Sequence, residues 1–222
     1  MKKLGKEIDL LANYPKSKRD LTARLDSKST ESRLIGRKFG FDYFDGDRNF
    51  GYGGFSYNPK FWQPVIPTIR DFYGLTGSSS VLDVGCAKGY FLYDLQLLIP
   101  TISIRGLDIS EYAIENSKIE VKNNLLVGNA TSLPFKNNSF DLVISVNTIH
   151  NLDKHNCAIA LKEIERVSRG KSFITVDAYR NNLEKERMEA WNLTAQTIMS
   201  VDEWKNFFLE VGYTGDFFWF TP

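Results

Sequence analysis

From residue 61 onward, short apolar runs alternate with longer amphipathic stretches. The runs of strand length are residues 80–84, 102–107, 124–127, 140–146 and 172–177. The stretches with helical spacing are residues 65–73, 89–98, 110–122 and 155–168. Strands that are apolar on both faces and are separated by helices predict an α/β fold with a doubly wound, mostly parallel sheet and helices on both faces. The ligand of such a fold lies outside the carboxyl ends of the strands.

The end of the chain adds one helix and one strand to this pattern. Ser200, followed three residues later by Glu203, matches a capping box, and Gly212 can end the helix that it begins. The run GDFFWF then predicts a last strand. The sheet therefore has six predicted strands, and the sequence does not locate a seventh.

The first 60 residues follow neither pattern and form a predicted N-terminal extension, so the domain itself spans residues 61–222. Residues 39–62 interleave aromatic side chains with Gly, Asp and Asn, which suits a segment folded over a pocket. Residues 1–40 hold eleven Lys or Arg against five Asp or Glu, although the whole chain has a net charge of only +1. The basic arm is interpreted as a solvated amphipathic extension, with contact to phosphate as the alternative.

Several other classes of protein and site are disfavoured. No window approaches about 18 consecutive apolar residues, and the N-terminus lacks a signal-peptide core, so no membrane partner is expected. Two cysteines are too few for a disulfide framework, which favours a reduced, cytoplasmic location. Two histidines without a nearby carboxylate cluster predict no metal site. The near-neutral charge makes a nucleic-acid partner unlikely.

The most informative segment is VLDVGCAKGYF, at residues 81–91. A buried strand runs into a glycine turn and then into a helix, so backbone amides can approach a ligand at the helix N-terminus. A dinucleotide fingerprint GxGxxG would need glycine at 85, 87 and 90, but the chain has Ala87 and Tyr90 at two of these positions. Asp83 would also repel a pyrophosphate, whereas its carboxylate suits a ligand that carries an ammonium group.

Four segments in order resemble one family: VLDVGCAKG, then GLDIS, then GNATSLPFKNNSFDLVISVNTIHNL, then EIERVSRGKSFITVDAY. They are similar to the class I S-adenosylmethionine-dependent methyltransferases, in particular the branch that methylates small molecules and quinones. The resemblance covers about residues 78–178. It implies a Rossmann-like domain that binds S-adenosylmethionine and releases S-adenosylhomocysteine.

By this resemblance, Asp83 helps to hold the methionine ammonium group, and Gly85, Cys86 and Gly89 line the turn against the cofactor. Ala87 stands where the family more often has glycine.

At the next strands, the resemblance places the ribose hydroxyls on Asp108, with Ile109 directly after it. Two carboxylate oxygens suit two hydroxyls, and Ser110 is a better helix cap than Asp108. Asn129 and Ala130 correspond to the adenine contact, although the family commonly has Asp at the first position. Asn147 corresponds to the stretch beside the methionine part of the cofactor.

His150 is the only histidine near the expected reaction centre. Imidazole is suited to proton removal near neutral pH, so His150 is the candidate catalytic base or substrate contact. The alternative is a histidine that bonds the backbone at a junction of strand and helix.

The acceptor site is predicted on the extension and after the fifth strand. Tyr52 corresponds to tyrosines that lie against the sulfonium in some relatives, with simple packing as the alternative. The candidate substrate residues are Arg48, Tyr57, Asp177, Tyr179 and Arg180. They favour a polar acceptor, sugar-like or anionic, over an apolar quinone.

The leading hypothesis is therefore a methyltransferase acting on oxygen, nitrogen or carbon of a soluble small molecule, as a monomer or homodimer. The alternatives are a tRNA or protein methyltransferase and a non-catalytic regulator or partner subunit that binds S-adenosylmethionine. A NAD-dependent dehydrogenase is a distant third.

Overall fold

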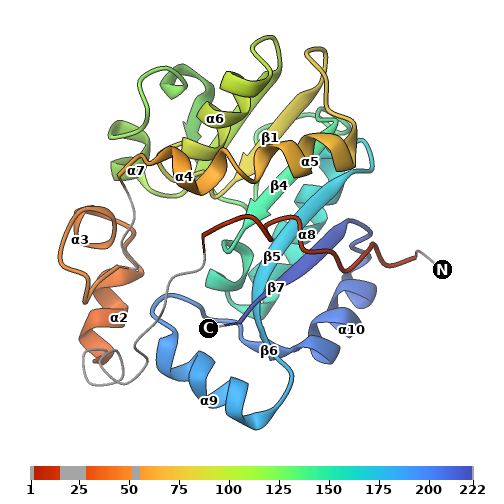
Figure 1. Ribbon diagram of the computed structural model, residues 1–222. Coiled ribbons are helices and arrows are strands. Elements are labelled where there is room, and N and C mark those ends of the chain that lie inside the picture. Colours follow the sequence, from red (N-terminus) through yellow and green to blue (C-terminus); the bar gives the residue numbers. More distant parts are fainter. Residues whose placement is uncertain (1–2, 16–28, 52–55, 222) are drawn as a thin grey trace.

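The computed structural model describes residues 3–15, 29–51 and 56–221 of the chain. Seven strands form one sheet: β1 Ser80–Val84, β2 Ser103–Asp108, β3 Leu125–Val127, β4 Leu142–Val146, β5 Ser172–Tyr179, β6 Met199–Ser200 and β7 Asp216–Phe220. The order is β3-β2-β1-β4-β5, and both β6 and β7 pair with the far edge of β5. Every pairing between these strands is parallel. The predicted doubly wound α/β fold is confirmed, with its strands carried in a single sheet (Figure 1).

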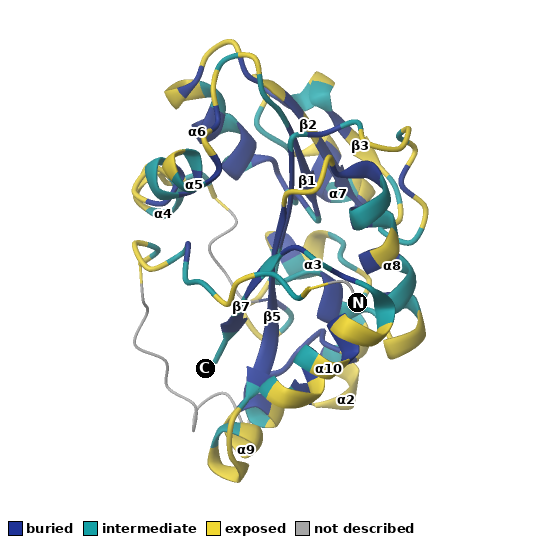
Figure 2. Cartoon of the chain, turned by 90° about the vertical axis from the view of Figure 1, so that its right-hand side faces the viewer, coloured by how far each residue is buried: buried dark blue, intermediate teal, exposed yellow. Residues whose placement is uncertain are grey.

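The α-helices of the described residues are α2 Thr30–Gly36, α3 Phe41–Phe44, α4 Pro59–Trp62, α5 Ile66–Tyr73, α6 Tyr90–Leu98, α7 Glu111–Glu115, α8 Lys154–Val167, α9 Asn182–Trp191 and α10 Val201–Val211. Two short 3-10 helices, η1 Lys122–Asn124 and η2 Ile149–Asn151, complete the set. Figure 2 shows α4, α5 and α6 on one side of the sheet and α8 and α10 on the other. One apolar core packs α5 and α6 against the sheet, and a second packs α8 and α10 against it. The sheet is therefore buried on both faces, as its apolar runs predict.

One predicted helix is wrong in length. The stretch 110–122 forms only α7, which ends at Glu115. Beyond it, the backbone N–H of Lys118 donates to the carbonyl oxygen of Lys88 at 3.0 Å, so this segment bonds the turn before α6 rather than its own preceding turn.

The C-terminal prediction is confirmed, with one addition. Ser200 and Glu203 form the capping box of α10, and Gly212 ends that helix in the left-handed region at φ 78°. The strand that the sequence did not locate is β6, which has two residues and pairs with Ala178 and Tyr179 of β5. Helix α9 was not predicted either.

The first described segment, residues 3–15, continues the sheet beyond β7. The backbone N–H of Ile8 donates to the carbonyl oxygen of Phe217, and the N–H of Phe217 donates to the carbonyl oxygen of Lys6, both at 3.0 Å. Leu10 is buried with the core residues around α5 and α6. Figure 1 shows this segment crossing the front of the molecule toward α4. A division of the chain at residue 60 stays a prediction.

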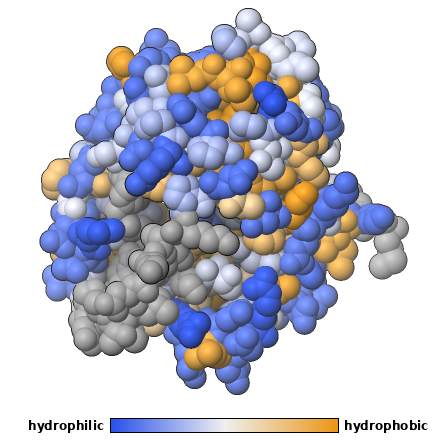
Figure 3. Space-filling model, in the orientation of Figure 1, coloured by the Kyte–Doolittle hydropathy of each residue, from blue (hydrophilic) through white to orange (hydrophobic). Residues whose placement is uncertain are grey.

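Figure 3 shows hydrophobic side chains gathered over the upper part of the same face, where Figure 1 places α4, α5 and α6. A hollow of about 300 Å³ lies among Gln63, Ile66, Asp94, Leu97 and Leu98. The lower part of the face is more hydrophilic.

Candidate functional site

The turn between β1 and α6 has a backbone that only certain residues adopt readily. Gly85 and Gly89 have positive φ, at 85° and 75°, and Ala87 has φ 48°. A side chain on Gly85 would also place Cβ 2.1 Å from Oγ1 of Thr148. Glycine is therefore required at 85, and the left-handed Ala87 is a strained residue of the kind that gathers at functional sites.

Asp108 closes the second side of this turn. Its Oδ2 accepts the backbone N–H of Ala87 at 2.7 Å, and its Oδ1 accepts the N–H of Ser110 at 2.9 Å. The backbone N–H of Ile109 also bonds this carboxylate, and the buried side chain keeps part of its acceptor capacity for a ligand. Ser110 caps α7 through Ala113, so Asp108 is not needed as that cap.

Asp83 and Asp108 form a buried acidic pair at the carboxyl ends of β1 and β2. Burial, and then the charge of Asp108, raise the pKa of Asp83 to about 8. Burial also raises the pKa of Asp108, against the effect of its backbone hydrogen bonds. No salt bridge among the described residues includes either carboxylate. A ligand with positive charge would favour the ionised form of both groups.

The turn also contains Cys86, whose backbone N–H donates to the carbonyl oxygen of Leu107 at 3.1 Å. Its thiol is buried beside Gly106, where an added Cβ would lie 2.7 Å from Sγ. Burial raises the pKa of this thiol well above its usual value. Cys86 therefore lines the turn with its backbone, while its side chain packs against β2.

The residues after β2 and β3 lie side by side because the two strands are parallel neighbours. Ile109 follows Asp108, and its large apolar side chain is 54% exposed. Gly128 donates its N–H to the carbonyl oxygen of Asp108 at 2.8 Å and so brings the following residues, Asn129 and Ala130, to the same edge. The amide oxygen of Asn129 accepts from Thr131, which leaves its NH₂ group as the available donor.

Asn147 follows β4 in the left-handed region, at φ 51°. Its N–H donates to the backbone oxygen and to Oγ1 of Thr175, at 3.1 and 3.0 Å, and Thr175 Oγ1 donates to Asn147 Oδ1 at 2.8 Å. Nδ2 of Asn151 donates to the carbonyl oxygen of Asn147 at 3.3 Å. The Oδ1 atom of Asn151 is buried and has no hydrogen-bond partner among the described residues. Thr175 and Asn151 are site residues that the sequence interpretation missed, because neither stands in a recognisable motif.

His150 lies in η2 and is buried against β5. Its Nδ1 accepts the backbone N–H of Asp177 at 3.0 Å, and its Nε2 lies 3.6 Å from Oδ1 of the same residue. Burial lowers the pKa of His150, although the charge of Asp177 opposes this. With Nδ1 accepting a hydrogen bond, the neutral ring carries its proton on Nε2. These contacts match the interpretation of a backbone-bonded histidine at a junction, and a catalytic role stays a prediction.

The position of two candidate substrate residues needs correction. Asp177 and Tyr179 were expected after the fifth strand, but β5 extends through Tyr179. The strand is longer because β6 pairs with its last residues, Ala178 and Tyr179. Asp177 is therefore fixed in the sheet beside His150, and Arg180 is the first residue beyond the strand.

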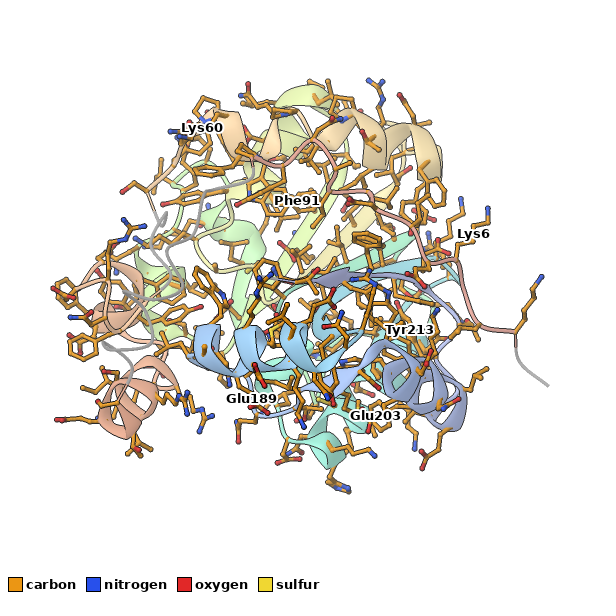
Figure 4. The ribbon with its side chains drawn as sticks, turned by 60° about the horizontal axis from the view of Figure 1, so that its bottom comes forward. Lys6, Lys60, Phe91, Glu189, Glu203 and Tyr213 are labelled. Carbon is orange, nitrogen blue, oxygen red and sulfur yellow. The ribbon has the colours of Figure 1, made fainter. Side chains whose placement is uncertain are left out.

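Residues 29–51, called here the strap, form hydrogen bonds both near Asp108 and with the segment that follows α9. The carbonyl oxygen of Phe39 accepts from Oγ of Ser110, beside the cofactor-side residues. At the other end, Arg37 donates to the carbonyl oxygens of Thr194 and Ala195, both at 3.2 Å. Arg33 donates to the carbonyl oxygen of Glu189, which is labelled on α9 in Figure 4.

The remaining candidate substrate residues do not form one cluster. The hydroxyl of Tyr57 donates to Asp94 on α6 at 2.7 Å. Burial, and then the hydrogen bond with Asp94, raise the pKa of Tyr57 to about 12. Arg180 is near Glu184 of α9, with NH1 and Oε2 3.8 Å apart. Tyr179 donates from its hydroxyl to Glu203 at 3.4 Å.

Two further candidates are Arg48 and Tyr52. Arg48 is exposed on the strap. Tyr52 lies outside the described residues.

Two other kinds of feature were sought in the part of the chain that the structure describes. No group of three or more His, Cys, Asp and Glu residues there could hold a metal ion. None of its helices is long and apolar enough to cross a membrane.

Comparison with known proteins connects this geometry to one family. The family model described as "Methyltransferase domain" matches residues 82–190. A demethylmenaquinone methyltransferase of Lactococcus lactis is 37% identical over 107 residues, which are 45% of this chain and 41% of the relative. A malonyl-[acyl-carrier protein] O-methyltransferase of Legionella pneumophila is 28% identical over 120 residues, 52% of this chain and 42% of the relative. The chain thus spans less than half the length of these curated relatives.

Among solved structures, a methyltransferase bound to the Trm112 methyltransferase activator of Haloferax volcanii matches with a TM-score of 0.53. The sequences are 22% identical, and the match covers 66% of this chain and 71% of the other. At this identity the likeness shows the fold alone.

Proposed function

Because the chain belongs to the class I S-adenosylmethionine-dependent methyltransferases, we propose that it transfers a methyl group to oxygen, nitrogen or carbon of a small, polar acceptor. The observation that carries the proposal is the buried pair Asp83 and Asp108, which have no cationic partner among the described residues and which lie at the carboxyl ends of neighbouring strands. Such a pair suits a ligand with two hydroxyls and an ammonium group.

The residues of the site fit this cofactor. Asp108 would accept hydrogen bonds from the ribose hydroxyls, and Asp83 would face the ammonium group. Ile109 would lie against the adenine ring, with Ala130 and the Asn129 NH₂ group beside it. Bound S-adenosylmethionine would supply an electrophilic methyl group on its sulfonium.

The methionine part would lie along the turn and Asn147. The glycines at 85 and 89 let backbone N–H groups approach the ligand, and Cys86 contributes its backbone there. The left-handed Asn147, held by Thr175, fixes the opposite wall. Tyr52 stays a proposed sulfonium contact. The protein's contribution would be to align the reactants and exclude water.

The acceptor side is supported by polar groups near Asn147. The buried Oδ1 atom of Asn151 has no hydrogen-bond donor in the described parts of the chain, which favours an acceptor that brings a hydroxyl or amino hydrogen. His150 is proposed as a contact on this side. To remove a proton with Nε2, the neutral ring would have to carry its own proton on Nδ1. Nδ1 instead accepts a hydrogen bond from the N–H of Asp177, which favours positioning of the acceptor over proton removal. Arg48, Tyr57, Asp177, Tyr179 and Arg180 remain the proposed substrate residues.

The basic arm gives weak support to a tRNA or protein acceptor. Two of its arginines, Arg33 and Arg37, donate to main-chain carbonyl oxygens of the same chain, so part of each guanidinium group is already engaged. Salt-dependent RNA binding at low salt that depends on residues 1–40 would favour the tRNA alternative. Both cysteines are free, in keeping with a proposed cytoplasmic location. A monomer or homodimer is proposed, and no membrane partner.

Calorimetry with S-adenosylmethionine and S-adenosylhomocysteine tests the proposal first. Binding of neither ligand would overturn it. Incubating the protein and isotope-labelled S-adenosylmethionine with a fractionated metabolite extract would then reveal a labelled product by mass spectrometry. Binding without transfer to any fraction would favour the non-catalytic alternative.

A further inference from the structure

The cofactor turn contains a lysine that is buried and paired with the strap. Lys88 is 5% exposed, and its Nζ lies 2.6 and 2.8 Å from Oδ1 and Oδ2 of Asp45. The hydroxyl of Tyr112 donates to Oδ2 of the same carboxylate at 2.6 Å. Burial raises the pKa of Asp45, but these hydrogen bonds outweigh it and the pKa is lowered overall. The hydrogen bond with Asp45 raises the pKa of Tyr112 to about 12. Asp45 therefore joins two elements of the site to the strap.

The ion pair also restrains the backbone of the turn. Lys88 stands between Ala87 and Gly89, both with positive φ. Its carbonyl oxygen accepts the N–H of Lys118, and its side chain ends at Asp45. Lys88 is thus held through its main chain by Lys118 and through its side chain by Asp45.

The charge of Lys88 is unfavourable for the proposed cofactor. S-adenosylmethionine carries one more positive charge than S-adenosylhomocysteine, because its sulfur is a sulfonium. A buried ammonium group in the turn would repel the first ligand more than the second. A carboxylate within hydrogen-bond distance of that ammonium cancels most of this difference.

We propose that Asp45 is a positioning residue that neutralises Lys88, so that docking of the strap lets the turn accept cationic S-adenosylmethionine without the penalty that an unpaired Lys88 would impose relative to the neutral product. This inference rests on the proposed function. It makes the strap part of the cofactor site, although the strap lies outside the matched methyltransferase domain.

The test compares the affinities of the two ligands by calorimetry at low salt. We expect Asp45→Asn to lower the affinity for S-adenosylmethionine about three- to tenfold more than that for S-adenosylhomocysteine, the size expected for one unit charge across a partly buried site. Lys88→Met, which leaves Asp45 unneutralised, should move the ratio in the opposite direction. The double variant should return the ratio close to that of the wild type.

The controls separate charge from general loss of structure. Asp45→Glu keeps the charge and should retain the wild-type ratio. Asp42→Asn removes an exposed carboxylate of α3, the helix that ends directly before Asp45, and should leave the ratio unchanged. If Asp45→Asn fails to fold, the direction of the Lys88→Met shift still decides the question.

A ratio that stays constant in both single variants, or moves the same way in both, would overturn the inference even if both ligands bind. If the wild-type protein binds neither ligand, the proposed function itself fails. High salt should reduce the shift, because it screens partly exposed charges.

Discussion

The cofactor side of the site and its acceptor side are held together by different kinds of contact. On the cofactor side, Asp83, the glycine turn and Asp108 occupy the ends of neighbouring parallel strands, so the sheet itself brings them together. On the acceptor side, the strap bonds carbonyl oxygens of Thr194 and Ala195, far away in the sequence. The first arrangement depends on side chains that a ligand can use, and the second mainly on main-chain atoms.

The difference teaches where the chain is under functional constraint. Two acidic side chains buried close together destabilise the free protein, and a ligand cation relieves this. The bonds of the strap to carbonyl oxygens stabilise the protein without requiring a particular residue on the other side. We therefore expect substitutions on the cofactor side to change ligand affinity, and substitutions of the strap residues that bond these carbonyl oxygens to change local stability.

The strongest test of the cofactor side is Asp108→Ala. Two charge-assisted hydrogen bonds to ligand hydroxyls would be lost, each contributing about 1.5–3 kcal/mol, so affinity for S-adenosylhomocysteine should fall about 100-fold or more. Calorimetry measures the change. Asp141→Asn is the matched control, because Asp141 also accepts backbone N–H of another strand, from Ser80 at 2.8 Å, but at the opposite end of the sheet. An unchanged affinity in Asp108→Ala would show that the ribose is misplaced.

A second test compares two substitutions of His150. Asn can keep an acceptor near the position of Nδ1, whereas Gln places its polar atoms near Nε2. The Gln variant should be about 1–3 kcal/mol less stable than the Asn variant, because the buried N–H of Asp177 loses its partner. Equal stabilities in chemical denaturation would contradict this view of Nδ1.

The same histidine gives stability a pH dependence. Its folded pKa lies below 6.5, so below about pH 6.5 the unfolded chain takes up a proton that the folded chain does not. Stability should therefore decrease as the pH falls through this range, and the decrease should be smaller in His150→Asn.

The acidic pair predicts proton release on binding of the ligand. In the free protein the pKa of Asp83 is about 8, so the group is largely protonated at neutral pH. A bound ammonium group favours its ionised form, and affinity should rise with pH by up to about tenfold per unit below pH 8. Calorimetry in buffers of different ionisation enthalpy counts the released protons.

Asp83→Asn serves as the control for this proton. It should abolish the release and weaken binding, yet raise the melting temperature of the free protein. The sign follows from the raised pKa. Between about pH 4 and pH 8 the unfolded chain loses the proton of Asp83 while the folded chain keeps it, so the free energy of unfolding falls as the pH rises through this range. A variant that melts at a lower temperature would argue against a strained acidic pair.

The smallest effect is expected in the strap. Arg37→Ala should reduce stability by about 1 kcal/mol and increase hydrogen exchange in residues 29–51 and 192–197, with less than a twofold change in affinity for S-adenosylhomocysteine. Lys38→Ala, which removes an exposed neighbouring cation, should change neither. A large loss of ligand affinity in Arg37→Ala would remove the distinction between the two sides.

The sequence predicted most of the elements because their signals are local. The run SVLDV and the capping box at Ser200 each carry enough information within a few residues. The helix expected over 110–122 stopped at Glu115 because Lys118 bonds Lys88, which no local pattern reveals. Strand β6 was missed because two residues become a strand only through their register with β5.

The same limit applies to the candidate site. The positions after β1, β2, β3 and β4 could be predicted to meet, since parallel strands end at one edge. The pairing of Asp45 with Lys88, and of His150 with the backbone of Asp177, could not, because both join segments with no fixed spacing. Only the folded chain brings these groups within hydrogen-bond distance.

The contact between residues 6–8 and β7 has a consequence for how the protein folds. Phe217 both donates to Lys6 and accepts from Ile8, so one edge of the sheet joins segments about 210 residues apart. Contacts of such sequence separation form slowly, and during synthesis the first segment must wait for the last strand to leave the ribosome. The early strands can pair before then, but the edge of β5 stays open until nearly the whole described chain has been made.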